Sequence, residues 1–157
     1  MNHVVISPFG FDWFFWNILT LFFILFIVLI PRKQSDKFKS NCTIFFALLL
    51  VFEYIFIQSY FVYKGIWTPQ DSLPFHLCRL MLFNTIILLF TRNQIAFELM
   101  LFVGMVGGFH SLMTPELTHG SDLVLLVDYF LVHGGLVAAP LYCIFVLGMR
   151  PRKMAWL

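Results

Sequence analysis

Three residues able to support nucleophilic and acid–base chemistry lie in apolar surroundings in this chain: His76, Cys78 and His133. A cysteine thiolate attacks an ester carbonyl efficiently when a histidine takes the thiol proton. His76 and Cys78 are about 200° apart around a helix, so the two need not face one cavity. A pair formed between helices, Cys78 with His110 or His133, would serve the same chemistry. We therefore predict a catalytic site made of His76, Cys78 and His133.

Other polar side chains in apolar stretches are expected to line a substrate cavity near these three. Ionisable groups inside a membrane are costly and are functional candidates by default. Tyr129 precedes His133 by four residues and shares its helix face. Asp128 lies about 140° from His133 in helical projection and is not its obvious partner. The predicted lining residues are Glu53, Arg79, His110, Thr114, Glu116 and Tyr129.

The composition indicates that lipid is the solvent for most of this chain. Hydrophobic residues make up 61% of the 157 residues and charged residues only 11%. Soluble domains are about 25% charged, and a soluble fold of this size could not bury so much apolar surface. The lipid bilayer is therefore the first expected partner.

Long apolar runs predict the elements that hold the site. Each run is near the roughly 20 residues that a spanning helix needs, and none alternates like a barrel strand. We predict an all-α polytopic transmembrane helix bundle of about five spanning helices, forming a single domain over residues 1–157. The helices are expected near residues 9–30, 42–63, 74–90, 95–113 and 123–147.

The positions of lysine and arginine predict the orientation. Eight of the ten basic residues fall in the first loop, the third loop and the tail, and only Lys64 falls in the opposite loops. Basic residues accumulate in short cytoplasmic loops. The pattern places the N-terminus outside and the C-terminus in the cytoplasm.

The chain shows no pattern that calls for a metal or another cofactor. Its three cysteines are widely spaced, and no HxxxH, HExxH or paired-cysteine motif is present. No basic cluster with interleaved aromatic residues indicates nucleic acid. Gly104 and Gly108 form a GxxxG pair, which favours close helix association and suggests a homo-oligomer or another membrane subunit.

Several short motifs in the second half of the chain carry a family resemblance. They are Leu73-Pro74-Phe75-His76-Leu77-Cys78, Phe97-Glu98-Leu99, Gly107-Gly108, Leu112-Met113-Thr114-Pro115-Glu116-Leu117, Phe130-Leu131-Val132-His133-Gly134, Pro140-Leu141-Tyr142 and Gly148-Met149-Arg150-Pro151. In this order and spacing they resemble the YwaF-like family of bacterial membrane proteins, over residues 73–151.

The resemblance implies a bundle of six or seven helices in a bacterial plasma membrane. It also implies distant similarity to the eukaryotic transmembrane protein 164 group and to its phospholipid acyltransferase activity. In that group the reactive cysteine immediately precedes a histidine, whereas Cys78 follows His76 by two residues. Family chains normally continue after Arg-Pro with about two more helices, so this chain resembles a member that lacks the last helices.

Three classes of function fit these features. The first is an enzyme acting on membrane lipids through the His/Cys site, an acyltransferase or hydrolase. The second is a small transporter or transporter subunit that uses Glu53 and His133 near the membrane midplane. The third is a non-catalytic partner protein in which the glycine pairs mediate helix association.

Overall fold

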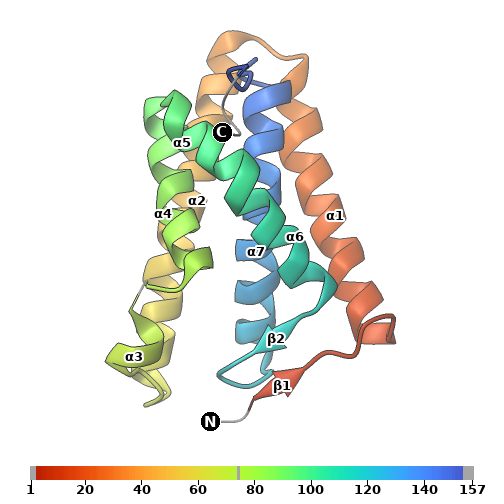
Figure 1. Cartoon of the computed structure of the whole chain (residues 1–157), viewed down its shortest axis with the longest axis vertical. Coiled ribbons are helices and arrows are strands. Elements are labelled where there is room, and N and C mark those ends of the chain that lie inside the picture. Colours follow the sequence, from red (N-terminus) through yellow and green to blue (C-terminus); the bar gives the residue numbers. More distant parts are fainter. Residues whose placement is uncertain (1–2, 74, 154–157) are drawn as a thin grey trace.

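The chain folds into an all-α bundle, shown by a computed structural model that describes residues 3–73 and 75–153 (Figure 1). In chain order the elements are β1 (Val4–Val5), α1 (Phe11–Arg32), α2 (Asp36–Tyr63), α3 (Pro69–Ser72), α4 (Leu77–Thr91), α5 (Gln94–Leu99), the π-helical turn η1 (Met100–Gly104), α6 (Met105–Met113), β2 (Glu116–Leu117) and α7 (Leu123–Phe145). Because α5, η1 and α6 follow one another without a break, they form one helix over residues 94–113.

Within the described residues, four helices are long and apolar enough to cross a membrane. They are α1, α2, the continuous 94–113 helix and α7. The fifth apolar helix, α4, has 15 residues and therefore a length of about 22 Å, which is less than the roughly 30 Å of a hydrocarbon core. The prediction of an all-α polytopic bundle of about five spanning helices is confirmed, with four full-length candidate spans and the shorter α4.

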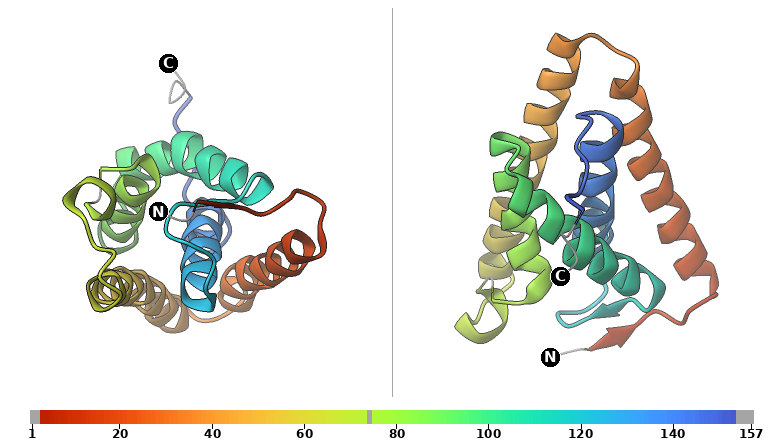
Figure 2. Two further views of the ribbon diagram at one scale, coloured as in Figure 1. Left: turned by 90° about the horizontal axis from the view of Figure 1, so that it is seen from below. Right: turned by 45° about the horizontal axis from the view of Figure 1, so that its top comes forward.

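Helix α7 lies in the middle of the bundle, with α1, α2, α4 and α6 around it (Figure 2). Of the four long spans, α7 buries the largest share of its residues. Helix α1 instead exposes a row of large apolar side chains, among them Phe15, Phe22 and Phe26. The helix that carries His133 is therefore the one most enclosed by protein.

The two ends of the bundle differ in charge (Figure 1). One end, called the basic end below, holds the α1–α2 turn with Lys33, the α4–α5 turn with Arg92, and the segment with Arg152 after α7. The other end, called the strand end, holds β1, β2 and α3. The basic loops thus gather on one side, as a single membrane orientation requires.

Local capping explains where the helices begin. The Ser35 hydroxyl accepts a hydrogen bond from the Phe38 amide, so α2 begins at Asp36, ahead of the apolar run that starts at Cys42. Pro74, the expected start of the third helix, lies outside the described residues, and α4 begins at Leu77.

Small residues let neighbouring helices approach α7 closely. A Cβ atom on Gly108 of α6 would lie 2.9 Å from the His133 carbonyl oxygen, and one on Gly134 would lie 2.6 Å from the Thr20 methyl group on α1. Gly135 faces Leu50 of α2 in the same way. These glycines therefore serve packing inside the chain.

A short two-stranded antiparallel sheet closes the bundle at the strand end. β1 pairs antiparallel with β2, placing Val4 opposite Leu117 and Val5 opposite Glu116. The Ile6 amide also donates to the Pro115 carbonyl at 3.1 Å. The N-terminal segment thereby holds the connection between α6 and α7 in place.

Candidate functional site

A polar cavity of about 360 Å³ opens inside the half of the bundle nearer the strand end. It is lined by residues of α2, α4, α6, α7 and the connection between α6 and α7. Its position follows from the short α4. At this end of the bundle α2 extends further than α4, which begins deeper in the bundle (Figure 1). Non-helical backbone at membrane depth is tolerated where it borders such a cavity.

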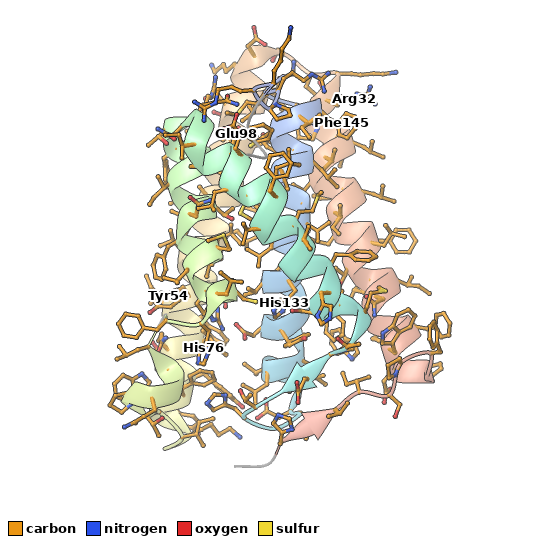
Figure 3. The ribbon with its side chains drawn as sticks, in the orientation of Figure 1. Arg32, Tyr54, His76, Glu98, His133 and Phe145 are labelled. Atoms are coloured by element: carbon orange, nitrogen blue, oxygen red, sulfur yellow. The ribbon has the colours of Figure 1, made fainter. Side chains whose placement is uncertain are left out.

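Eight of the nine residues selected from the sequence line this cavity. They are His76, Cys78, Arg79, His110, Thr114, Glu116, Tyr129 and His133. The ninth, Glu53, is buried and reaches the site through a hydrogen bond with Arg79. Figure 3 shows His76 and His133 in the half of the bundle nearer the strand end, with Arg32, Glu98 and Phe145 at the basic end.

Cys78 occupies the first turn of α4, where His76 is the N-cap residue. Helix N-termini carry partial positive charge and favour a negative group such as a thiolate. Ser111 of α6 lines the same cavity. The half-buried Cys78 therefore lines the cavity at a helix N-terminus.

His133 is held in one orientation on α7. Its Nδ1 lies 2.7 Å from the Tyr129 carbonyl oxygen, and its ring lies 4.2 Å from the Tyr129 ring. Because a carbonyl oxygen only accepts, Nδ1 must carry the hydrogen, which leaves Nε2 unprotonated in the neutral ring. His133 can therefore accept a proton at Nε2.

Tyr129 also ties three parts of the site together. Its hydroxyl donates to the Ser111 carbonyl at 2.9 Å and accepts from the Glu116 amide at 3.3 Å. These bonds join the middle of α7 to the end of α6 and to β2. The lining residues that follow α6 are thus fixed relative to His133.

Arg79 makes ion pairs with carboxylates from two other helices. Its Nη1 donates to Glu53 Oε1 of α2 at 2.9 Å, and its Nη2 donates to both oxygens of Asp128 of α7, at 2.9 and 3.0 Å. The guanidinium and both carboxylates are largely buried. Arg79, Glu53 and Asp128 are called the carboxylate–arginine triad below.

Asp128 lines the cavity but was not among the residues selected from the sequence. From its helical angle, Asp128 was not expected to be the partner of His133. In the structure its partner is Arg79. The available signal was its charge within an apolar run, because a charge inside a membrane requires an opposite charge nearby.

The remaining selected residues form the rim. His76, His110, Thr114 and Glu116 are exposed at the surface of the chain. Glu116 pairs with His3 at 3.1 Å, and the His119 ring stacks on Phe61 at 4.7 Å. Three less buried histidines, His76, His110 and His119, thus line the cavity, while His133 is buried.

A second hollow lies on the other side of α7, against α1. It has a volume of about 420 Å³, and every lining residue except Thr20 is apolar: Trp16, Leu19, Phe22, Phe23, Phe26, Val127, Phe130 and Leu131. Its one hydroxyl among the described lining residues, on Thr20, donates to the Trp16 carbonyl oxygen.

A bundle of apolar helices around a polar cavity defines a multi-pass integral membrane protein. The chain belongs to the TMEM164 family, whose model matches residues 6–157. The match includes α1 and α2, which the motifs between Leu73 and Pro151 did not cover. The comparisons with curated proteins and with solved structures found no match.

Proposed function

We propose that this protein is a membrane enzyme that transfers acyl chains from lipid esters through a thioester on Cys78. One observation carries the proposal: Cys78, in the first turn of α4, lines the same polar cavity as His110 and His133. The acyltransferase activity implied by the sequence resemblance agrees with it. We propose likewise that the chain is a YwaF-like protein of the bacterial plasma membrane.

The chemistry needs only groups that the cavity contains. The Cys78 sulfur bonds to the ester carbonyl carbon while its proton passes to His133 Nε2. When the ester C–O bond breaks, that proton moves from Nε2 to the leaving alcohol. A second hydroxyl, from another lipid or from water, then attacks the thioester carbonyl carbon and gives its proton to Nε2. The C–S bond breaks, and Nε2 returns the proton to the Cys78 sulfur.

His133 suits the role of base better than the other histidines. Its Nδ1–H is held by the Tyr129 carbonyl, so Nε2 is the free acceptor, and the ring is buried. His76 and His110 lie at the exposed rim. They are better placed to contact a polar headgroup than to remove a proton deep in the site.

Trapping the acyl-enzyme tests this proposal. The purified protein would be incubated in nanodiscs with a defined diacyl phospholipid and examined by mass spectrometry. We expect one acyl chain on the peptide that contains Cys78, released by hydroxylamine and absent from C78A. In H133Q the rate of acylation should fall by about 10²–10⁴-fold, the usual contribution of a general base.

The other two cysteines provide matched controls. Cys42 lies near the start of α2 at the basic end, and Cys143 is fully buried in the core. C42A and C143A should both acylate at the wild-type rate. Acylation that persists in C78A, or lipid turnover without any cysteine adduct, would show the proposal to be wrong.

A transport function is the second candidate, favoured by the buried charges of Glu53, Arg79 and Asp128 between α2, α4 and α7. Such groups mark ion and proton pathways in membranes. Proteoliposomes with an imposed pH gradient would decide. Proton flux lost in E53Q but kept in C78A would favour transport over acyl transfer.

The partner-protein candidate would need a contact surface other than the GxxxG pair. Gly108 packs against the α7 backbone, and Gly104 faces the Met100 side chain of its own helix. Neither glycine of the GxxxG pair is therefore free for association with another subunit.

A further inference from the structure

The carboxylate–arginine triad contains more negative than positive charge. Two carboxyl groups, Glu53 and Asp128, share the single guanidinium of Arg79. With all three groups ionised, the triad carries one net negative charge. The Glu53 side chain is only 5% exposed and that of Asp128 14%, so water does little to stabilise this charge.

The described residues around the triad offer no second permanent positive charge. Among the described residues that line the cavity, Arg79 is the only lysine or arginine. The other titratable groups that face the triad or the cavity are thiol, phenol, imidazole or carboxyl groups. From α4 comes Cys78, from α6 His110, from α7 Tyr129 and His133, from the α6–α7 connection Glu116 and His119, and from the N-cap of α4 His76.

One oxygen of the pair is unsatisfied in the absence of a proton. Glu53 Oε2 is buried and has no hydrogen-bond partner among the described residues. The Glu53 and Asp128 carboxyl groups are held beside each other, because both accept from the same Arg79 guanidinium. Two ionised carboxylates can only accept, so a hydrogen bond between them requires one proton.

A metal ion fits this position poorly. Calcium takes six to eight oxygen ligands and magnesium about six. The described residues include no cluster of three or more histidine, cysteine or acidic side chains that could hold a metal. Arg79 already occupies one Glu53 oxygen and both Asp128 oxygens.

We propose that Glu53 and Asp128 together bind one proton, which makes the carboxylate–arginine triad a neutral, proton-binding site beside the cavity. Since Asp128 lines the cavity, the proton can exchange with its contents. Losing the proton would leave a negative charge at the cavity wall, so the charge of the cavity depends on pH. This inference does not depend on thioester chemistry at Cys78.

Infrared spectroscopy of the protein in nanodiscs tests the proposal, because the carbonyl stretch of a protonated carboxyl group is distinct from carboxylate bands. At neutral pH the wild type should show one such band, shifted in D₂O and lost as the pH is raised. E53Q and D128N should each lack it. In either variant one amide replaces one acid, and Arg79 balances the remaining carboxylate.

Glu98 supplies the matched control. It is a buried glutamate, but it accepts hydrogen bonds from Gln94 and from the Arg152 amide and guanidinium, so it needs no proton. E98Q should keep the band. The proposal is overturned if the wild type has no such band, or if the band survives in both E53Q and D128N. A band that disappears on adding sodium at constant pH would identify a cation site instead and would also overturn it.

If one variant does not fold, the other variant and the wild-type pH titration still decide. C78A separates this proposal from acyl transfer. It should keep the infrared band whether or not Cys78 forms a thioester.

Discussion

At the scale of single residues, charges inside this protein are held by partners on other helices. Arg79 joins α4 to Glu53 of α2 and to Asp128 of α7. At the basic end, Arg152 pairs with the buried Glu98 of α5. Each pair spans a separation along the chain of 26, 49 or 54 residues. We expect such links to help fix the positions of the helices relative to one another.

Asp122 is the residue whose ionisation we expect to stabilise the strand end. It caps α7 by accepting from the Leu125 amide at 3.2 Å, accepts from the Tyr60 hydroxyl at 2.8 Å and lies 3.6 Å from Lys64. Burial alone would raise the pKa of Asp122, but Tyr60, the Leu125 amide and Lys64 together lower it. D122A should therefore reduce the free energy of unfolding by about 1 kcal/mol at neutral pH, the usual value of an N-cap.

The pH dependence follows from the sign of that shift. A lowered folded-state pKa contributes stability above the ordinary aspartate pKa of about 3.9, and this contribution is lost as the pH falls through the folded-state value. The difference in melting temperature between wild type and D122A in detergent should shrink between pH 6 and pH 3. D36A, which removes a fully exposed carboxylate, should show no comparable trend. A constant D122A difference across this range would contradict the account.

Much of the candidate site could be predicted from residue type and helical periodicity. Tyr129 and His133 share a face because they are four residues apart. The geometry around Cys78 could not be predicted in this way. His76 has extended backbone (φ −71°, ψ 140°) and precedes the helix, so the 200° helical angle between the two residues does not apply. Both residues line the cavity for this reason.

At the scale of elements, apolar runs predict which segments form helices, whereas caps determine the ends. The polar first turns of α2 lie outside any apolar run, and Ser35 places them in the helix. The pairing between helices is not encoded in such runs. Asp128 could not be matched to Arg79 from the sequence because their distance depends on how α4 and α7 pack.

The contact between α6 and α7 provides a test of packing. Gly108 lies against the His133 carbonyl and the Leu136 Cβ atom, which an added Cβ would approach to 2.9 and 3.0 Å. The neighbouring Gly107 has no atom within 4 Å of such a Cβ. G108A should therefore separate the two helices and cost about 1–3 kcal/mol. G107A should be neutral or stabilising, since alanine favours a helix over glycine by up to about 1 kcal/mol.

Thermal unfolding of both variants in the same detergent checks this prediction. The two substitutions add the same methyl group to adjacent positions, so their difference isolates the contact with α7. Equal melting temperatures for G108A and G107A would mean that α6 and α7 do not pack through Gly108. Since His133 belongs to this contact, G108A should also slow acylation of Cys78.

At the scale of the whole molecule, the gathering of charge at one end determines how the site meets the membrane. The basic end carries Arg32, Lys33, Arg92 and Arg152, and the cavity opens in the opposite half. If the basic end faces the cytoplasm, the cavity serves the outer leaflet. Lipid or proton exchange at the site would then take place from outside the cell.

Labelling from one side of the membrane tests this orientation. In a variant without native cysteines, Ser121→Cys places a thiol at an exposed position just before α7, at the strand end. Gln34→Cys places one in the exposed α1–α2 turn at the basic end. An impermeant maleimide should label Ser121→Cys on intact cells, and Gln34→Cys only after permeabilisation. Replacing Lys33, Lys37 and Lys39 by glutamine should give mixed labelling, because basic residues in short loops set the orientation. The reverse labelling pattern in the two single-cysteine variants that keep these lysines would place the cavity on the cytoplasmic side. Its lipid substrate would then lie in the inner leaflet.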